Sequence, residues 1–472
     1  MLLFKKRWVK CHMSFLARDF EKLTHAESAP RAIITLPYSK GAPTLNSEND
    51  GSARDQRSNQ SQSDQGKGLV TPPVISLPKG GGAIRGIGEK FAANPVTGTG
   101  SMTVPIAASP GRSGFGPQLA LSYDSGGGNG PFGFGWNLSL PAITRKTDKG
   151  LPRYNDLEES DVFILSGAED LVPVLVKKNG GWGQDSVPPR AVDKKTYIIK
   201  RYRPRIEGLF ARIERWTNLK KPKETFWRSI SKDNITTWYG KTEQSRIVDP
   251  ADPTRIFSWL ICESYDDKGN VISYRYQSED GENVDLSQAH EENRGLKTDS
   301  LRSANRYLKS VFYGNRKPYL PKLLAGEEWP APPDTDKDDY TDRWMFEVVF
   351  DYEEGHYTPR QRDTDGHEIV DATTIPSKRW AVRNDPFSSY RAGFEVRTYR
   401  LCQRALMFHH FPGEAEVGAN CLVRSTDFEY SYEQNSADPR NPIFSFLRSV
   451  TQSGYKRQGG ASPFVTGLRD RA

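Results

Sequence analysis

The chain has 472 residues, a formal net charge of +7, 36% hydrophobic residues and 11% aromatic residues. Its mean hydropathy is −0.69, and no apolar run approaches the ~20 residues of a membrane-spanning helix, which excludes a helical membrane protein. The 41 glycines and 32 prolines favour a β-rich, turn-rich protein over a helical bundle or a coiled coil.

The N-terminal segment, residues 1–72, differs in composition from the rest. Residues 1–40 hold eight basic and three acidic side chains, so this arm carries +5 of the net charge. Residues 41–70 are mostly small and polar, and they cannot bury enough apolar surface to offset the entropy of ordering. We expect a basic arm with a short helix at 13–24, a disordered linker, and order from about Pro72. No zinc-finger, RRM or KH pattern accompanies the charge, which predicts a solvated tail and no nucleic-acid partner.

Cysteine usage and the N-terminus bear on the compartment. The chain has four cysteines, widely spaced and without a CxxC pair, which excludes a disulfide scaffold and a zinc site of the usual spacing. No apolar segment of signal-peptide length follows Met1. We therefore expect synthesis in the cytoplasm with reduced thiols, and any secretion to occur without a standard signal peptide.

Glycine clusters and alternating apolar residues dominate residues 80–141. Residues 80–135 hold 16 of the 41 glycines, and the apolar alternations between the clusters predict strands joined by turns. The run Pro-Phe-Gly-Phe-Gly-Trp at 131–136 places three aromatic rings at alternate positions. Because glycine removes side-chain bulk between the rings, we expect a second backbone to approach closely there.

The clearest later element is a hairpin. Residues 257–262 and 272–277 alternate in hydropathy, and residues 264–270 between them supply turn-forming Asp, Gly and Asn. Other strands are expected at 344–352, at 428–432 and from Phe444, with a surface loop at 322–341. Residues 396–411 are expected to be a long strand segment, or two turns of a ribbon. The sequence predicts an all-β fold, a large antiparallel sheet with many hairpins.

Two motifs invite a catalytic or binding interpretation. The glycine cluster at 126–130 could cradle a phosphate, but it lacks the GK[ST] of a P-loop, and Pro131 follows where a helix should begin. Glu414 and Glu416 have the E-x-E spacing of arginine-type ADP-ribosyltransferases, but no Ser-x-Ser strand precedes them. Turns between strands account for both motifs better.

The histidines give no convincing metal site. His409 and His410 are adjacent on a predicted strand, so they point to opposite faces and cannot chelate one ion together. His356 and His367 with nearby aspartates are the remaining metal candidate. The sequence therefore predicts no catalytic, cofactor-binding or metal-binding residues, and no cofactor.

Long motif runs resemble a known family. Residues 75–91, 98–105, 114–123 and 131–136 resemble SpvB-type virulence proteins and insecticidal toxin-complex B components, and residues 380–402 resemble the toxin-complex B branch. The resemblance implies that residues 73–457 form a β-rich shell domain, after the arm and linker of 1–72 and before a truncated polar tail at 458–472. A β-propeller, expected next in the family, would be absent, so a fragment, a split gene or a degenerate copy is expected.

The resemblance also implies a function. Toxin-complex B components pair with a C component to build a hollow β-shell around a toxic cargo and dock onto an A channel. This chain would be a non-enzymatic wall module, secreted, with the rest of the B shell and a C component as partners and without direct membrane insertion. The alternatives are an ADP-ribosyltransferase-associated virulence protein and a carbohydrate- or surface-binding β module that uses Trp136 or Trp238.

Overall fold

The computed structural model describes residues 90–94, 98–166, 170–178, 180–192, 194–292, 294, 300–321, 342–360, 368–431, 444–457 and 464–467. Strands are the predominant regular secondary structure of these ranges and helical segments are few and short, which confirms the predicted all-β fold. Their helical segments are α2 (Ala289–Glu292) and the 3-10 segments η1 (Arg112–Gly114), η2 (Glu243–Ser245) and η3 (Ser300–Ala304). None of these helices has the length and apolar character needed to cross a bilayer. The predicted helix at 13–24, the linker at 41–70, the start of order at Pro72 and the loop at 322–341 lie outside the described residues.

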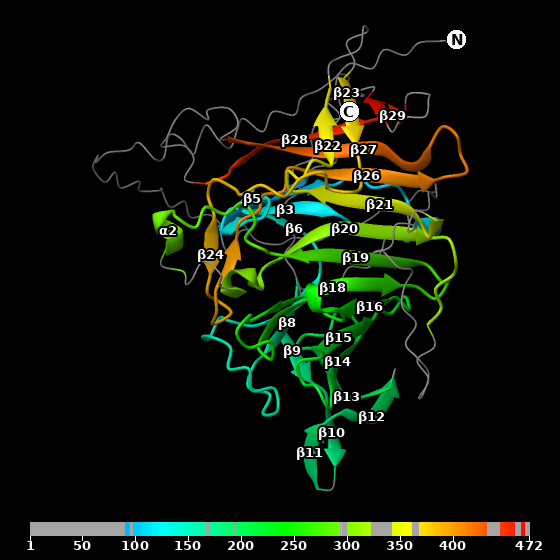
Figure 1. Cartoon of the computed structure of the whole chain (residues 1–472). Helices are drawn as coiled ribbons and strands as arrows, with labels where there is room; N and C mark the ends of the chain where they lie inside the picture. Colours follow the sequence, from blue (N-terminus) through cyan, green and yellow to red (C-terminus); the bar gives the residue numbers. More distant parts are fainter. Residues whose placement is uncertain are drawn as a thin grey trace, which may run out of the picture. The chain divides into compact units, whose positions relative to one another are not determined.

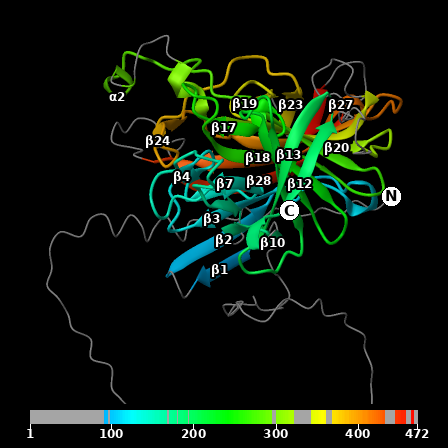
Figure 2. The same ribbon diagram turned by 90° about the horizontal axis from the view of Figure 1, so that it is seen from below.

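The first sheet is small and antiparallel. Its order is β1 (Lys90–Asn94), β2 (Thr99–Pro105), β3 (Ala120–Asp124) and β6 (Trp136–Leu138), and Figure 2 shows β1, β2 and β3 side by side. In the chain segment between β3 and β6, the two-residue strands β4 (Asn129–Gly130) and β5 (Gly133–Phe134) pair with each other. Val104 and Leu121 oppose each other across β2 and β3, and both are buried.

A second part of the fold is a closed ring of eight strands. The ring closes because β18 pairs with β7 on one edge and with β16 on the other. In spatial order its strands are β7 (Ala142–Arg145), β8 (Phe163–Leu165), β9 (Asp170–Pro173), β13 (Lys195–Pro204), β14 (Arg212–Asn218), β15 (Thr225–Ile230), β16 (Thr236–Tyr239) and β18 (Ile256–Tyr265). Phe163, Trp227 and Trp259 are buried and make edge-on ring contacts, 4.9 to 5.9 Å between centroids. Aromatic burial of this size is a dominant stabilising contribution.

Two further strands pair with strands of the ring, and one hairpin forms a separate sheet. The strand β12 (Ser186–Val192) pairs with β13, and β17 (Arg246–Val248) pairs with β18. The hairpin of β10 (Leu175–Lys178) and β11 (Gly181–Gln184) is a two-stranded sheet of its own at the lower end of Figure 1.

From β18 the same sheet continues as a wall of successive antiparallel strands, stacked in Figure 1. Its strands are β18, β19 (Val271–Ser278), β20 (Arg306–Asn315), β21 (Trp344–Asp351), β26 (Arg404–Phe411), β27 (Gly418–Tyr430) and β28 (Leu447–Gly454). The predicted hairpin is confirmed, since β18 and β19 pair with Tyr265 opposite Val271. Its turn is fixed by the Asp266 carboxylate, which accepts hydrogen bonds from the Lys268 and Asn270 N–H groups at 3.0 and 2.8 Å.

A small sheet packs on the wall through apolar residues. Its order is β22 (Tyr357–Pro359), β23 (Glu368–Ala372), β30 (Phe464–Gly467) and β29 (Lys456–Arg457), and β30 lies within the segment predicted as a polar tail. Val370 of β23 packs in one buried cluster with Val349, Leu406 and Leu422 of the wall.

Residues 396–411 do not form one continuous strand. Two strands occupy this segment, β25 (Val396–Thr398), which pairs with β24 (Phe387–Ser389), and β26, which belongs to the wall. The chain between them is not a strand, and its Arg400 is fully buried against Glu279. The strand predicted from Phe444 begins three residues later, at Leu447.

Candidate functional site at the junction of the two motif segments

The Pro-Phe-Gly-Phe-Gly-Trp run is held by backbone hydrogen bonds to two distant segments. The Cys402 N–H donates to the Pro131 carbonyl at 2.9 Å, and the Phe134 N–H donates to the Ser445 carbonyl at 2.8 Å. Phe132 is buried and packs edge-on against Phe350 of the wall at 6.3 Å between centroids. The run therefore bridges the N-terminal sheet and the wall.

The two glycines of this run permit close backbone contacts. A Cβ on Gly133 would lie 2.6 Å from the Ser445 carbonyl oxygen, and its φ of +94° is unfavourable for an L side chain. A Cβ on Gly135 would lie 2.5 Å from the Tyr123 ring, and its φ is +79°. These contacts confirm the close approach predicted from the sequence.

A buried ion pair joins the two residues that precede the run, Asn129 and Gly130, to the second motif segment, residues 380–402. The Arg383 guanidinium donates two hydrogen bonds to the Asp385 carboxylate, at 2.8 and 3.0 Å. The same guanidinium reaches the Gly130 carbonyl at 2.8 Å and the Asn129 side-chain oxygen at 2.9 Å. Asp385 also accepts hydrogen bonds from the Ser445 N–H and hydroxyl, both at 2.6 Å. One ion pair thus connects three chain segments, and we call it the junction pair.

The protonation of the junction pair follows from these contacts. Burial by itself raises the pKa of Asp385, but the hydrogen bonds and charge of Arg383, with Ser445 and Asn129, lower that pKa below its usual value. The carboxylate is therefore ionised at neutral pH and is occupied by donors from the protein.

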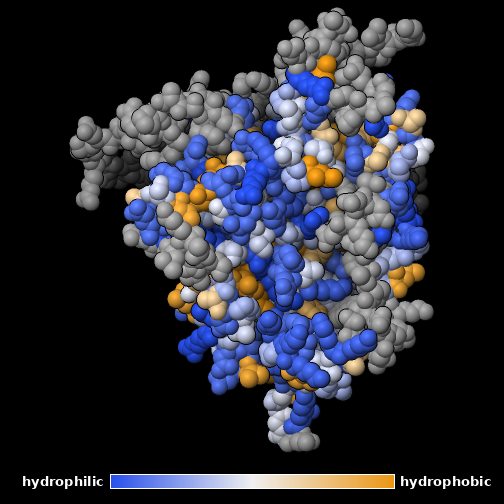
Figure 3. All heavy atoms as spheres, viewed as in Figure 1, coloured by the Kyte–Doolittle hydropathy of each residue, from blue (hydrophilic) through white to orange (hydrophobic). Residues whose placement is uncertain are grey.

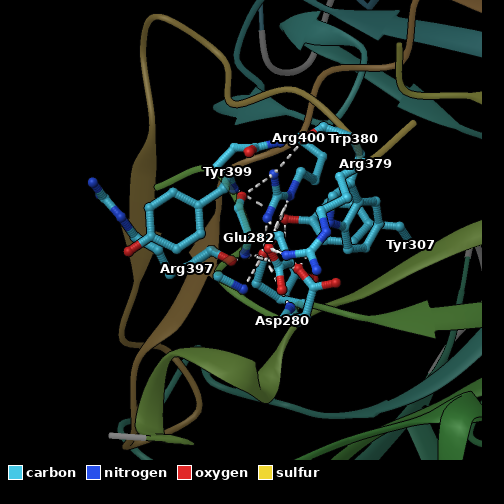
Figure 4. Close-up of polar contacts among 12 residues, drawn as sticks. Asp280, Glu282, Tyr307, Arg379, Trp380, Arg397, Tyr399 and Arg400 are labelled. Carbon is cyan, nitrogen blue, oxygen red and sulfur yellow. Dashed lines mark hydrogen bonds and ion pairs between the residues drawn. The ribbon is translucent and has the colours of Figure 1, made fainter. Parts of the chain in front are cut away.

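A second buried ion pair fixes the end of the 380–402 segment (Figure 4). Arg400 and Glu279 are almost completely buried and pair through several guanidinium hydrogen bonds. The Arg400 guanidinium also stacks over the Trp380 ring, 4.5 Å from its centroid, and donates to the Glu282 carbonyl at 2.9 Å. Because buried charges need a partner and hydrogen bonds, this cluster depends on Arg400 and Trp380 of the 380–402 segment together with the loop after β19.

Beside it lies a third carboxylate, Glu291 on α2. It accepts hydrogen bonds from the Arg397 guanidinium and the Tyr399 hydroxyl, both at 2.6 Å. Burial alone would raise the pKa of Glu291, but these donors and the neighbouring arginines lower it. In this region each buried carboxylate thus accepts several hydrogen bonds from protein donors, and such an arrangement positions segments rather than holding a reactive group.

The glycine cluster and the E-x-E motif both form turns, as expected. The Gly126 N–H donates to the Asp124 carboxylate at 2.7 Å, and the Gly127 N–H donates to the Asp124 carbonyl at 2.8 Å. Glu414 and Glu416 are exposed on the turn between β26 and β27. The structure does not bring either carboxylate to the junction pair.

The two adjacent histidines point to opposite faces of β26, as predicted. His409 packs against Phe346, and burial lowers its pKa to about 4. His410 is buried with its Nε2 atom 3.2 Å from the Glu347 carboxylate.

The other metal candidate, His356 with His367, falls partly outside the described residues. His356 is buried beside the Glu354 carboxylate, 3.7 Å away, and His367 lies outside the described residues. Over the described ranges no group of three His, Cys, Asp or Glu side chains could hold a metal ion. Trp136 and Trp238 are buried core residues, so neither offers the open ring face that a sugar-binding site needs.

Sequence reasoning missed Arg383, Asp385, Arg400 and Glu279. One signal was available: Arg383 and Asp385 alternate, so they lie on one side of an extended segment and can pair. Glu279 as the partner of Arg400 had no local signal, because 121 residues separate them.

Comparisons with known proteins agree with this architecture. The sequence profile described as Salmonella virulence plasmid 65kDa B protein matches residues 94–411. The chain is 36% identical over 398 residues to mono(ADP-ribosyl)transferase SpvB of Salmonella choleraesuis and, equally, to that of Salmonella dublin. Each match covers 83% of this chain but 58% of the relative, so the chain spans less than two thirds of the length of these relatives.

Solved structures show the same fold. The N-terminal domain of effector protein SpvB from Salmonella typhimurium is 35% identical with a TM-score of 0.58, and the match covers 75% of this chain and 98% of that one. The TcdB2-TccC3 crystal structure is 30% identical with a TM-score of 0.64, over 84% of this chain and 17% of that one. The Photorhabdus luminescens Tc holotoxin pore is 30% identical with a TM-score of 0.64, and the match covers 84% of this chain and 16% of that one. The sequence identity, the matched profile and the shared fold together place this chain in the SpvB family.

Proposed function

We propose that this chain is a structural wall module of a toxin-complex B component, which helps to enclose and deliver a toxic C-component cargo. The observation that carries the proposal is the likeness to TcdB2-TccC3, which covers most of this chain but a small part of that much larger one. A unit that recurs as one part of a larger chain is suited to a building role. Its partners would be the rest of the B shell and a C component, and indirectly an A channel, with no nucleic-acid partner and no direct membrane insertion.

The polar clusters support a non-enzymatic role. Asp385 and Arg400 are both buried, and each is satisfied by protein donors or acceptors. A catalytic carboxylate or arginine must instead meet a substrate. We therefore propose that the chain has a structural role and no catalytic one, within an assembly that is exported from the bacterial cell.

Co-expression tests the proposal. The full chain is produced with a C component and with a B component from which the matched region has been deleted, and the mixture is separated by size-exclusion chromatography. We expect the chain to elute with both partners in one stable complex. Elution of the chain alone under all salt conditions would count against a wall module.

An activity assay tests the absence of catalysis. The full chain is incubated with labelled NAD and cell lysate, beside its Glu416→Ala variant. We expect no labelled protein with either, because Glu416 lies on an exposed turn. Label transfer by the natural chain that disappears in the variant would instead establish an ADP-ribosyltransferase.

A further inference from the structure

A buried cluster of ionisable groups lies where the small sheet leaves the wall. The outer face is mostly hydrophilic in the view of Figure 3, with apolar residues in small separate patches. Inside the molecule, Lys309 of β20 is buried with Glu354 and His356 of the segment between β21 and β22. Ionisable side chains are seldom enclosed unless they are paired, so the pairing of these three groups decides how they respond to pH.

His356 connects this segment to the small sheet through both its backbone and its ring. It immediately precedes β22, and Thr373 immediately follows β23. The Thr373 N–H donates to the His356 carbonyl at 2.9 Å, and the His356 Nδ1 atom lies 3.0 Å from the Thr373 carbonyl oxygen. Because a carbonyl can only accept, Nδ1 carries the hydrogen of this bond, and the neutral ring has its bare nitrogen at Nε2.

The bare nitrogen faces a carboxylate. Nε2 of His356 is buried, has no hydrogen-bond partner among the described residues and lies 3.7 Å from the Glu354 carboxylate. In the neutral ring Nε2 is an acceptor, to which a carboxylate offers no hydrogen. A proton on Nε2 would turn this contact into an ion pair, so the ring has a defined position at which it can take up a proton.

Lys309 competes for the same carboxylate. Its ammonium group contacts the Glu354 carboxylate and donates to the Phe350 carbonyl at 3.2 Å. Burial lowers the pKa of Lys309 to about 7, so the ammonium group is charged throughout the acidic range. Protonation of His356 would therefore place two buried cations against Glu354, and one carboxylate cannot neutralise both.

The neighbouring strands supply further ionisable groups around this cluster. They are Glu347 and Asp351 of β21, Arg404 and His410 of β26, Arg275 of β19 and the Cys402 thiol. Asp351 lies 3.9 Å from the Arg404 guanidinium, and Glu347 lies 3.2 Å from Nε2 of His410. Since these two carboxylates face basic side chains of their own, Glu354 is the carboxylate that a protonated His356 would have to share.

These surroundings set the response of His356 to pH. Burial and the positive charge of Lys309 lower the pKa of His356 below its usual value, and Asp351, Glu347 and the Thr373 carbonyl offset part of that shift. His356 is therefore neutral at pH 7. A segment that opens returns the ring to water and to its ordinary pKa of ~6.5, so the open form binds the proton more readily and is favoured as the pH falls below that value.

The segment around His356 has the geometry of a hinge. Glu353 and Gly355 have φ values of +68° and +79°, and they lie between the end of β21 and the start of β22. The Glu354 carbonyl accepts hydrogen bonds from the Ser377 and Lys378 N–H groups, both at 3.0 Å. Movement of this segment would therefore carry β22 and the turn after β23 with it.

We propose that His356 is a pH-sensitive latch, which holds β22 and β23 on the wall at neutral pH and loosens them when Nε2 is protonated at acidic pH. The buried cluster around Val370 is apolar and does not titrate, so the loosening is local and the rest of the wall stays folded. All of these contacts lie within the chain, so the latch does not depend on the proposed wall role.

Hydrogen exchange of the full chain, followed by mass spectrometry at about pH 7.5 and pH 5.5, tests the latch. Labelling times are scaled for the intrinsic pH dependence of amide exchange. One histidine with an ordinary pKa of ~6.5 can shift an opening equilibrium by at most about tenfold between these pH values. We expect protection in β22 and β23 to fall by about three- to tenfold at pH 5.5, with no such loss in β13 and β14 of the ring. Equal protection at both pH values would overturn the proposal.

Three variants assign the effect to its groups. His356→Asn keeps a donor for the Thr373 carbonyl but does not titrate, so β22 and β23 should be equally protected at both pH values. His290→Gln, the matched control, removes a histidine whose side chain is 53% exposed and should keep the loss at pH 5.5. Lys309→Met removes the competing cation, so a protonated His356 can pair with Glu354 and protection should rise at pH 5.5. An acid loss that persists in His356→Asn, or in folded Lys309→Met, would overturn the proposal; if Lys309→Met does not fold, His356→Asn and its control still decide.

Discussion

Gly133→Ala tests whether the close backbone contact of the motif run holds the sheets together. The new methyl group would lie 2.6 Å from the Ser445 carbonyl oxygen and 3.1 Å from the Tyr430 ring. The Ser445 backbone cannot easily retreat, because its N–H and hydroxyl bind Asp385 and its carbonyl accepts from Phe134. The variant must therefore disturb the junction pair or strain the run.

The expected size of the effect follows from two contributions. An L residue at the positive φ of Gly133 costs roughly 1–2 kcal/mol, and overpacking costs typically ~1–3 kcal/mol, so we expect a loss of about 2–5 kcal/mol. At ~2.1 cal/mol/K per residue, a cooperative unit of roughly 380 residues has an unfolding entropy of ~0.8 kcal/mol/K. The melting temperature should fall by about 3–6 °C as a result.

The assay is thermal unfolding of the full chain, monitored by calorimetry, with Gly128→Ala as the matched control. Gly128 belongs to the neighbouring glycine cluster, has no positive φ, and has open space where its Cβ would lie. The control should melt within about 1 °C of the natural chain, since a surface change of this kind costs ~0.5 kcal/mol or less. Equal melting temperatures for the Gly133→Ala variant and the natural chain would refute the reasoning.

Three further predictions concern charged residues. Arg383 lowers the pKa of Asp385 in the folded chain despite burial, so this carboxylate stabilises the fold above about pH 4, and the stabilisation is lost as the pH falls. In urea unfolding, the Asp385→Asn variant should therefore lose less stability between pH 5 and pH 3 than the natural chain does. An identical loss in both proteins would contradict this prediction. Arg400→Met should cost about 3–5 kcal/mol by leaving Glu279 buried and unpaired; Arg400→Met/Glu279→Gln should regain part of it, and a loss below ~1 kcal/mol for the single variant would be evidence against the buried pair. Glu416 lies on an exposed turn, so Glu416→Ala should change the free energy of unfolding, measured by urea denaturation, by no more than ~0.5 kcal/mol. A larger effect would mean that Glu416 has a structural partner.

Local patterns carried the parts of the fold that depend on neighbouring residues. The β18–β19 hairpin was predictable because alternating strands flank a turn whose Asp266 closes it from within the turn. The close contact at Gly133 was predictable because a small residue between aromatic rings has few other uses, although the sequence gives no sign that Ser445 is the neighbour.

Long-range partners account for what the sequence did not predict. The 396–411 segment alternates like one strand, but the burial of Arg400 beside Glu279 interrupts it, and that interaction is invisible in local hydropathy. The junction pair has the same character: Arg383 and Asp385 are close in sequence, whereas Asn129, which both contact, lies more than 250 residues away. Closure of the eight-stranded ring likewise depends on pairing between strands that lie far apart in the sequence, so no short stretch of sequence includes both partners.

The shared strand β18 has a consequence for biosynthesis. The Thr144 and Ser258 hydroxyls, which meet at 2.7 Å where β7 pairs with β18, are 114 residues apart in the chain. At a translation rate of about 5–20 residues per second, roughly 6–23 s pass between the synthesis of β7 and the synthesis of β18, the strand that pairs with its edge. During that interval the nascent polypeptide presents an unpaired strand edge, which is an aggregation hazard, so a chaperone bound over this stretch of synthesis would protect it.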